Sequence, residues 1–314
     1  MPATSASAPG KGILFGEHAV VYGRPAIAVP IKQVKATAIV RPLINEHSGF
    51  VRIQAEQINL DSTLPDLSEN NPIALAVRST LDALKVNQPP AFHLRISSTI
   101  PIGGGLGSGA AISVAVIRGV SSFLGKSLET ERISELAFDV EKLYHGNPSG
   151  IDNTVVAFEK PVYFVKGDPI EFIDLKEAFT LVIADTGKST PTRDTVAFVR
   201  SAWEADKQKF EALFTAIGEC TKRARQILTA GNPTDLGPLM DDNHFHLQAM
   251  GVSSPELDNL VVTARQEGAL GAKLSGGGRG GNIIALVRNN GDSERIKATL
   301  THAGATGTIV ARVQ

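Results

Sequence analysis

Residues 101–110 read PIGGGLGSGA, and five of the seven residues from Gly103 to Gly109 are glycine. The stretch before this run, 92–100, alternates apolar and polar residues, and the stretch after it, 110–125, is almost wholly apolar. We therefore predict a strand, a bare glycine turn and a buried helix in succession. Unpaired N–H groups at such a helix N-terminus bind anions, and glycine lets an anion approach the backbone closely. The pattern favours a phosphate-binding loop, with a turn needed only for packing as the alternative.

Two other phosphate-binding motifs fit this loop less well. A P-loop requires a lysine after its last glycine, and this loop contains no lysine. The Gly-x-Gly-x-x-Ala pattern of dinucleotide-binding folds matches Gly105, Gly107 and Ala110. That pattern belongs after a buried parallel strand, usually near the start of the chain, whereas this loop follows an amphipathic strand a third of the way along. A dinucleotide-dependent oxidoreductase is therefore a distant alternative.

Composition limits the classes of protein to which the chain can belong. At 314 residues the chain is long enough for two domains. Hydrophobic residues make up 42% and charged residues 20%, which is typical of a soluble globular protein. The formal net charge of −1 gives no sign of a nucleic-acid or membrane partner. The single cysteine, Cys220, excludes an intramolecular disulfide and favours a cytoplasmic location.

Strands and helices are mixed along the chain without strict alternation, which favours an α+β fold. The expected strands are 34–41, 50–55, 92–100, 178–186, two strands around a glycine loop within 271–287, and 307–313. The expected helices are 71–85, 110–125, 129–146, about 191–228, 234–250, 254–267 and 292–303.

Two further stretches combine glycines with charged residues. They are APGKGILFGEHAVVYGRPAIA at 8–28 and HGNPSGIDN at 145–153, where a turn presents an aspartate. The residues of interest are Lys11, Glu17, His18 and Asp152. Taken alone, Lys11 is explained equally well as a surface lysine, and Asp152 as a helix N-cap. Together with two glycine loops, these residues predict a functional site.

Three motifs of the sequence resemble the GHMP kinase superfamily, in the superfamily's order and over essentially the full chain. They are PGKGILFGEHAVVYG at 9–23, PIGGGLGSGAA at 101–111 and KLSGGGRGGN at 273–282. Within the superfamily, the mevalonate kinase family is the most similar. That narrower resemblance lies in GEHAVVYG at 16–23, in 145–153, and in LQAMGVSSPELDNLV at 247–261.

The resemblance implies a two-domain α+β fold. Residues 1–171 would form a domain like domain 2 of ribosomal protein S5, and residues 172–314 a ferredoxin-like domain. The implied reaction moves the γ-phosphoryl group of ATP to the 5-hydroxyl of (R)-mevalonate, with the acceptor between the domains. The implied ATP-binding residues are Pro101, Gly103, Gly104, Gly105, Leu106, Gly107, Ser108, Gly109 and Ala110.

The resemblance also implies roles for single residues. Asp152 matches the catalytic aspartate, which takes the proton of the acceptor hydroxyl, and Lys11 matches the lysine expected to pair with it. Glu141 matches the Mg²⁺ glutamate, with a solvated helix-surface glutamate as the alternative, and Ser108 offers a second oxygen ligand. The implied acceptor contacts are Glu17, His18 and Thr195. Of these, His18 would donate to the carboxylate or tertiary hydroxyl of mevalonate, unless it is a core histidine.

The sequence departs from the family pattern at two positions. Gly109 stands where the family has a second serine, which commonly binds the metal. Ser108 takes that role, or a water does, or Mg²⁺ rests on Glu141 and the phosphates. Arg279 stands where the family has a glycine. Its guanidinium would reach a phosphate or a substrate carboxylate, or else point to solvent.

Other readings remain open from the sequence. Another small-molecule kinase of the superfamily, such as phosphomevalonate or homoserine kinase, is the nearest alternative. A nucleotide-binding protein without catalysis is a more distant one. The resemblance implies ATP and Mg²⁺ in every kinase reading, and it is compatible with a homodimer.

Overall fold

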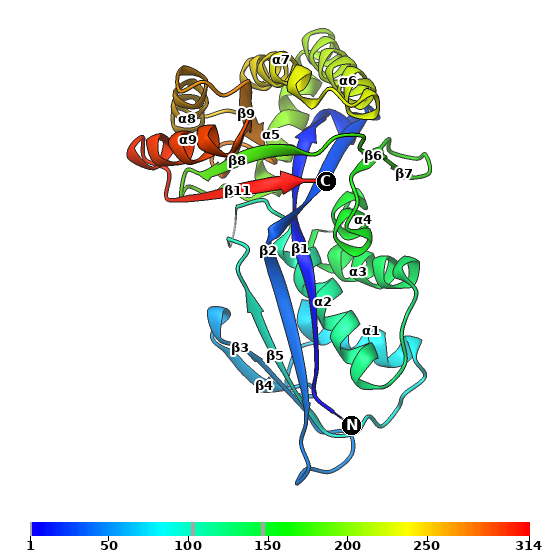
Figure 1. The fold of residues 1–314 in the computed structure, drawn as a ribbon. Coiled ribbons are helices and arrows are strands. Elements are labelled where there is room, and N and C mark those ends of the chain that lie inside the picture. Colours follow the sequence, from blue (N-terminus) through cyan, green and yellow to red (C-terminus); the bar gives the residue numbers. More distant parts are fainter. Residues whose placement is uncertain (1, 102–103, 146–147) are drawn as a thin grey trace. The chain divides into compact units, whose positions relative to one another are not determined.

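Helices and strands are mixed along residues 2–101, 104–145 and 148–314, the part of the chain that the computed structural model describes (Figure 1). The chain divides into two compact units, and neither is continuous in sequence. Unit 1 contains 1–10, 34–101 and 107–159; unit 2 contains 11–33, 102–106 and 160–314. The single boundary between 171 and 172 that the resemblance implies stays a prediction.

Unit 1 combines a sheet with a group of helices. The sheet contains, in order, β4 (Leu60–Thr63), β3 (Val51–Ala55), β5 (Phe92–Ser98) and the later part of β2 (Ala26–Pro42), and β1 (Thr4–Phe15) also pairs with β2. Strands β3 and β5 are parallel, whereas β4 is antiparallel to β3, and β2 to β5. In β5 the side chains of Phe92, Leu94 and Ile96 are buried, as the alternating sequence predicts.

The helices of unit 1 pack on one another. They are α1 (Pro72–Ala83), α2 (Ser108–Phe123), α3 (Thr130–His145) and α4 (Ile151–Phe158), and α2 contacts each of the other three. Apolar residues surround α2 on nearly every side, so it forms the buried centre of the group. Gly119 allows this helix to approach the sheet, because an added Cβ would lie 3.3 Å from Cβ of Ala38.

Unit 2 contains an antiparallel sheet in the order β11 (Gly307–Val313), β8 (Phe179–Asp185), β10 (Asn282–Val287), β9 (Gly271–Ser275). Numbered along the chain, this order is 4-1-3-2. Helices lie between the first and second of these strands and between the third and fourth, which makes the arrangement ferredoxin-like, as the resemblance implies. Helices α7 (Leu236–Ala249), α8 (Pro255–Gln266) and α9 (Asn290–His302) contact the sheet.

The predicted helix at 191–228 is two helices, and that prediction is wrong. The structure contains α5 (Thr192–Ala205) and α6 (Lys207–Ala230), separated at Asp206. Asp206 has non-helical backbone angles, and its side chain accepts a hydrogen bond from the N–H of Lys209 at 3.0 Å. An aspartate in this position caps the N-terminus of a new helix, and this local signal overrides the continuous apolar pattern.

Several elements were not predicted. They are β1 (Thr4–Phe15), β4, β6 (Val162–Phe164), β7 (Glu171–Phe172) and α4, a helix that only the N-cap alternative for Asp152 implies. Asp152 was expected on a turn but lies in the first turn of α4, because Gly150 adopts left-handed angles and begins the helix there. Within the described residues, no helix is both long enough and apolar enough to cross a bilayer.

Candidate active site

The second glycine motif leads directly into the N-terminus of α2. Gly107 is the N-cap, with φ +71°, a left-handed value that favours glycine. No side chain caps this end of the helix in the described part of the loop, and the first helical bond runs from Ala111 N–H to the Gly107 carbonyl. The N–H groups of residues 108–110 are therefore available to an anion such as a phosphate.

Packing alone does not explain the glycines of this loop. Gly105 and Gly109 are exposed, and an added Cβ at either position would meet no heavy atom within 4 Å. If these glycines were needed only for close packing, protein atoms would lie next to an added Cβ at Gly105 and Gly109. The open side of the loop instead leaves room for a ligand. Pro101 is half-buried at the start of the loop, and Gly103 lies outside the described residues.

Three hydrogen bonds join the three motifs to one another within unit 2. The N–H of Lys11 donates to the carbonyl of Leu106 at 2.9 Å, which joins the first motif to the second. Asn282 donates from Nδ2 to the carbonyl of Gly104, which joins the third motif to the second. The third bond joins the first motif to the third and runs from His18 to the carbonyl of Gly277. Segments that lie far apart in the sequence are thus joined by hydrogen bonds.

Asp152 and Glu141 lie on neighbouring helices of unit 1. Asp152 is half-buried in the first turn of α4, and Glu141 is 7% exposed on α3. Asn153 fixes these helices together, because its Nδ2 donates to the carbonyl of Ser134 at 3.1 Å and to its hydroxyl at 2.9 Å. The burial of Glu141 argues against a solvated surface glutamate. Lys11 is buried on β1 in unit 2, and its pairing with Asp152 stays a prediction.

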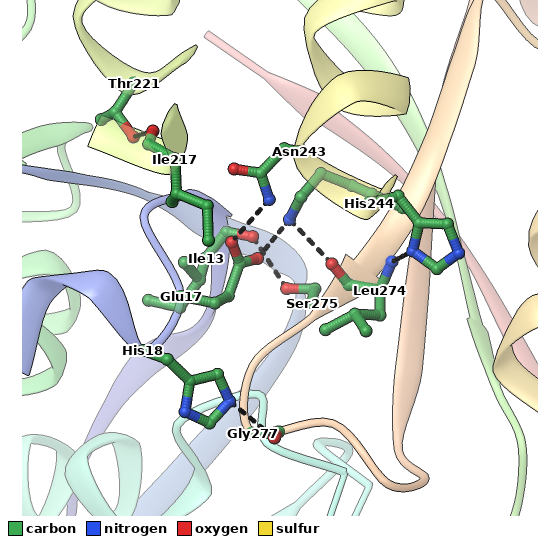
Figure 2. A network of polar contacts seen from close by, with 11 residues as sticks. Ile13, Glu17, His18, Ile217, Thr221, Asn243, His244, Leu274, Ser275 and Gly277 are labelled. Atoms are coloured by element: carbon green, nitrogen blue, oxygen red, sulfur yellow. Dashed lines mark hydrogen bonds and ion pairs between the residues drawn. The ribbon is translucent and has the colours of Figure 1, made fainter. Parts of the chain in front are cut away.

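Glu17 is almost wholly buried, and both of its carboxylate oxygens are engaged (Figure 2). Oε1 forms an ion pair with Nζ of Lys273 on β9, and Oε2 accepts a hydrogen bond from Nδ2 of Asn243 on α7 at 3.3 Å. Neither Lys273 nor Asn243 was predicted as a site residue from the sequence. One signal was available for Lys273, because it is the only charged residue in the strand GAKLS.

His18 donates from Nε2 to the carbonyl of Gly277 at 2.9 Å, since a carbonyl oxygen only accepts (Figure 2). Burial lowers the pKa of the His18 imidazole to about 4, although the bond to Gly277 acts in the opposite direction. The ring is therefore neutral at pH 7, with its hydrogen on Nε2. In this tautomer Nδ1 is a hydrogen-bond acceptor.

Thr195 lies in the first helical turns of α5 and is 0% exposed. Its Oγ1 has no hydrogen-bond partner among the described residues. A buried hydroxyl without a partner costs free energy, so it usually marks a strained or functional position. The observation fits the acceptor contact predicted for Thr195.

Most residues of the third glycine loop, 276–281, have left-handed backbone angles. Residues with positive φ are Gly276, Gly278, Arg279, Gly280 and Gly281. Gly278 is also tightly packed, because an added Cβ would lie 2.1 Å from the carbonyl oxygen of Val252. The two alternatives for Arg279, contact with a phosphate or carboxylate and exposure to solvent, stay predictions, and the structure adds two protein contacts. Its guanidinium stacks on the ring of Phe198 at 3.6 Å, and its Nε donates to the carbonyl of Gly251 at 3.3 Å.

The residues predicted to hold Mg²⁺ have suitable chemistry. Mg²⁺ prefers hard oxygen ligands and takes few of them from protein when phosphates and water supply the rest. The buried carboxylate of Glu141 and the half-buried hydroxyl of Ser108 lie on α3 and α2, which are in contact. No cluster of three or more acidic, histidine or cysteine side chains suited to a metal occurs in the described part of the chain. The oxygen atoms of Glu141 and Ser108 are of the kind that Mg²⁺ prefers.

Family models match both parts of the chain. Residues 71–160 match the GHMP kinases N terminal domain, and residues 224–306 match the GHMP kinases C terminal model. A curated relative, the mevalonate kinase of Pyrococcus horikoshii, is 37% identical over 304 residues, covering 90% of this chain and 88% of the relative.

Solved structures give the same result. The mevalonate kinase of Methanococcus jannaschii has a TM-score of 0.87 and 28% identity, and the match covers 99% of this chain and 98% of that one. The L. major mevalonate kinase, crystallised in complex with R-mevalonate, has a TM-score of 0.85 and 28% identity. That match covers 99% of this chain and 96% of the other.

Proposed function

We propose that this chain, which belongs to the mevalonate kinase family of the GHMP kinases, phosphorylates (R)-mevalonate. The γ-phosphoryl group of ATP moves to the 5-hydroxyl of mevalonate, which gives 5-phosphomevalonate and ADP. Membership of the family supports ATP as the phosphoryl donor, because GHMP kinases use ATP as co-substrate. The acceptor is assigned from relatives that carry the name mevalonate kinase over most of this chain.

The observation that carries the proposal is the convergence of the three motifs. Lys11, His18 and Asn282 each hydrogen-bond to a glycine loop of another motif, or to the residue next to its glycines. These bonds join the segment that contains Lys11 and His18 to residues of both glycine loops that lie in unit 2. A dinucleotide-dependent oxidoreductase would need only the second motif and leaves these contacts unexplained.

The proposed chemistry is an in-line transfer between oxygens. The 5-hydroxyl oxygen forms a bond to the γ-phosphorus, and the bond from that phosphorus to the β,γ-bridging oxygen breaks as ADP leaves. Asp152 takes the hydroxyl proton onto its carboxylate as the new bond forms. The ammonium of Lys11 stabilises negative charge on the attacking oxygen and the phosphoryl group. The N–H groups at the start of α2 bind the phosphates of the nucleotide.

Glu141 and Ser108 are the residues we propose for Mg²⁺. A bound Mg²⁺ would neutralise negative charge on the phosphate oxygens of the nucleotide.

The tautomer of His18 makes its proposed role more specific. Because Nε2–H is already donated to Gly277, the ring offers an acceptor at Nδ1. We propose that Nδ1 accepts a hydrogen bond from the tertiary hydroxyl of mevalonate. Donation by His18 to the substrate carboxylate would require breaking the Gly277 bond or protonating a ring whose pKa is about 4. The buried hydroxyl of Thr195 is the second acceptor contact.

A coupled assay of ADP release tests the function. The enzyme is supplied with ATP, Mg²⁺ and, in separate reactions, mevalonate, phosphomevalonate, homoserine and galactose. We expect turnover with mevalonate alone, at roughly 1–100 s⁻¹ as is usual for kinases. Turnover with one of the other acceptors, and not with mevalonate, would keep ATP use and overturn the acceptor assignment. ATP binding without turnover would indicate that Gly109 breaks the metal site.

Asp152→Asn tests the catalytic role. This variant keeps the shape of the side chain and removes the proton acceptor, so we expect turnover to be lost while ATP binding stays near the wild-type value. Asp168→Asn, at an exposed position, is the matched control and should leave turnover unchanged. Loss of ATP binding in Asp152→Asn would argue instead for a structural role. Light scattering of the purified chain tests separately whether it forms the homodimer with which the resemblance is compatible.

A further inference from the structure

Lys273 is a charged residue at a fully buried position, where an apolar residue is usual. It lies in the middle of β9, whose five residues are all buried, and its own side chain is 0% exposed. Burying an ammonium is costly unless it is paired and hydrogen-bonded, and an apolar residue of similar volume would fill the space without that cost. Burial accordingly lowers the pKa of Lys273, and Glu17 opposes that shift. The lysine therefore needs an explanation beyond packing.

Lys273 and its partners form a polar network (Figure 2). Nζ of Lys273 pairs with Oε1 of Glu17 and donates to the carbonyl of Leu274 at 2.7 Å. Asn243 donates to the other carboxylate oxygen of Glu17. The carboxylate is thus held from two elements, β9 and α7, and its direction is fixed. An apolar contact in the same place would be non-directional and would leave this orientation unspecified.

The residue after Glu17 is the one that needs orientation. His18 has φ +59°, a left-handed value that is unusual for a residue with a side chain. Such a conformation persists only where the surroundings hold it. Glu17 is bonded to residue 273 and His18 to residue 277, so two successive side chains hold β9 and the loop that follows it. Ser275, between those two, donates from Oγ to the carbonyl of Ile13 at 2.8 Å.

We propose that Lys273 is a positioning residue for acceptor binding, acting through Glu17 on His18. Its ammonium holds the Glu17 carboxylate, and the pair holds the His18 ring against Gly277, with Nδ1 facing the acceptor. Glu17 then has an indirect role in place of the direct substrate contact that the sequence predicts. This inference rests on the proposed function, because it takes His18 as a contact to the acceptor.

A double-mutant cycle tests the inference. The variants are Glu17→Met, Lys273→Met and the double variant. Each single variant leaves one buried charge without its partner, whereas the double variant leaves none and is expected to fold. We expect both single variants to raise KM for mevalonate at least tenfold, with KM for ATP within about twofold of wild type. The double variant should also raise KM for mevalonate, but by no more than the worse single variant, because the two residues act as one unit.

A second readout needs no acceptor. The His18 imidazole is titrated by NMR in wild type and in the double variant. In wild type we expect a midpoint near 4. If the pair holds the ring in its buried site, the midpoint in the double variant moves towards 6.5, the value of a free histidine. Arg279, whose charge also acts on His18, is unchanged in both proteins. Lys222→Met, which removes an exposed lysine paired with Glu219, is the control and should change neither the midpoint nor KM.

The outcomes separate the two proposals. If wild type does not phosphorylate mevalonate, the proposed function fails, and the His18 titration still decides whether Lys273 positions the ring. If Glu17→Met raises KM for mevalonate and Lys273→Met does not, Glu17 touches the acceptor by itself and the inference is wrong. If the single variants do not fold, a folded double variant decides alone. Wild-type values of KM and of the His18 midpoint in that protein would overturn the inference.

Discussion

The His18 ring donates from Nε2 to the carbonyl oxygen of Gly277 at 2.9 Å, across 259 positions of sequence. This single bond joins the first motif, at 9–23, to the third glycine loop, and it fixes the tautomer of a buried imidazole. A protonated ring could still donate this bond, but a buried positive charge costs free energy because it loses contact with water. That conflict makes the stability of the protein depend on pH.

Two buried histidines should make the protein less stable in mild acid. Burial lowers the pKa of both His18 and His244 to about 4, against about 6.5 in the unfolded chain. Between these values the unfolded state binds more protons, so stability falls as pH falls from 6.5 to 4. Each histidine contributes up to about 3 kcal/mol to this loss. Denaturant unfolding at a series of pH values measures it.

The variant His244→Gln isolates one of the two contributions. Its free energy of unfolding should depend less steeply on pH between 6.5 and 4 than that of wild type. His302→Gln, at an exposed position, is the control and should keep the wild-type slope. An unchanged slope in His244→Gln would show that this histidine is protonated in the folded protein, with the nearby Asp258, 3.3 Å away, outweighing burial.

Thr195→Val should weaken acceptor binding without harming the fold. The substitution keeps the shape and removes a buried hydroxyl that has no partner in the described part of the chain. We expect KM for mevalonate to rise roughly 3- to 10-fold, the effect of one lost hydrogen bond, and thermal stability to stay the same or increase. Thr221→Val is the matched control, because that buried hydroxyl already donates to the carbonyl of Ile217 at 2.8 Å. An equal rise in KM in both variants would refute a specific role.

Gly109→Ser should both stabilise α2 and strengthen metal binding. An added Cβ at Gly109 meets no heavy atom within 4 Å, and serine is a better helix former than glycine by about 0.5 kcal/mol. The new hydroxyl restores the oxygen that the family pattern has there, so the Mg²⁺ concentration for half-maximal turnover should fall. Gly109→Ala controls for the helix effect. If alanine lowers the Mg²⁺ requirement as much as serine, the hydroxyl is not a ligand.

Gly278→Ala should destabilise unit 2 strongly. The new Cβ would lie 2.1 Å from the carbonyl oxygen of Val252, at a residue with φ +76°. Strain and overpacking together predict a loss of about 3 kcal/mol in the free energy of unfolding. Gly307→Ala, where nothing lies within 4 Å, should change it by less than about 0.5 kcal/mol. A small effect at Gly278 would mean that the loop shifts away from Val252 without cost.

Much of the architecture could be predicted from local sequence. The alternation of apolar and polar residues in 92–98 predicts a strand with one buried face. The long apolar run that forms α2 predicts a helix buried on nearly all sides. The break at Asp206 could also have been predicted, since an N-cap is a local signal. Strand β1 could not, because glycine and small residues in its motif give no period.

The polar network behind the site was beyond sequence reasoning. Glu17 reads as a substrate ligand from its motif, yet its carboxylate is held by Lys273, 256 positions away, and by Asn243. Asn282 is visible as the last residue of the third motif, but not as the donor to Gly104. Nothing in the sequence indicates that the guanidinium of Arg279 stacks on the ring of Phe198. Each of these outcomes depends on which segments meet.

The sequence by itself determined the three motifs, the membership of the family and most of the helices and strands. These features follow from residue type and spacing, because backbone freedom, capping and periodic burial act over a few neighbouring residues. Only the tertiary structure decided the partner of each buried polar group: Glu17 for Lys273, Gly277 for His18, and none among the described residues for Oγ1 of Thr195. Ion pairs and hydrogen bonds act over a few ångströms of space, and distance along the chain does not determine distance in the fold.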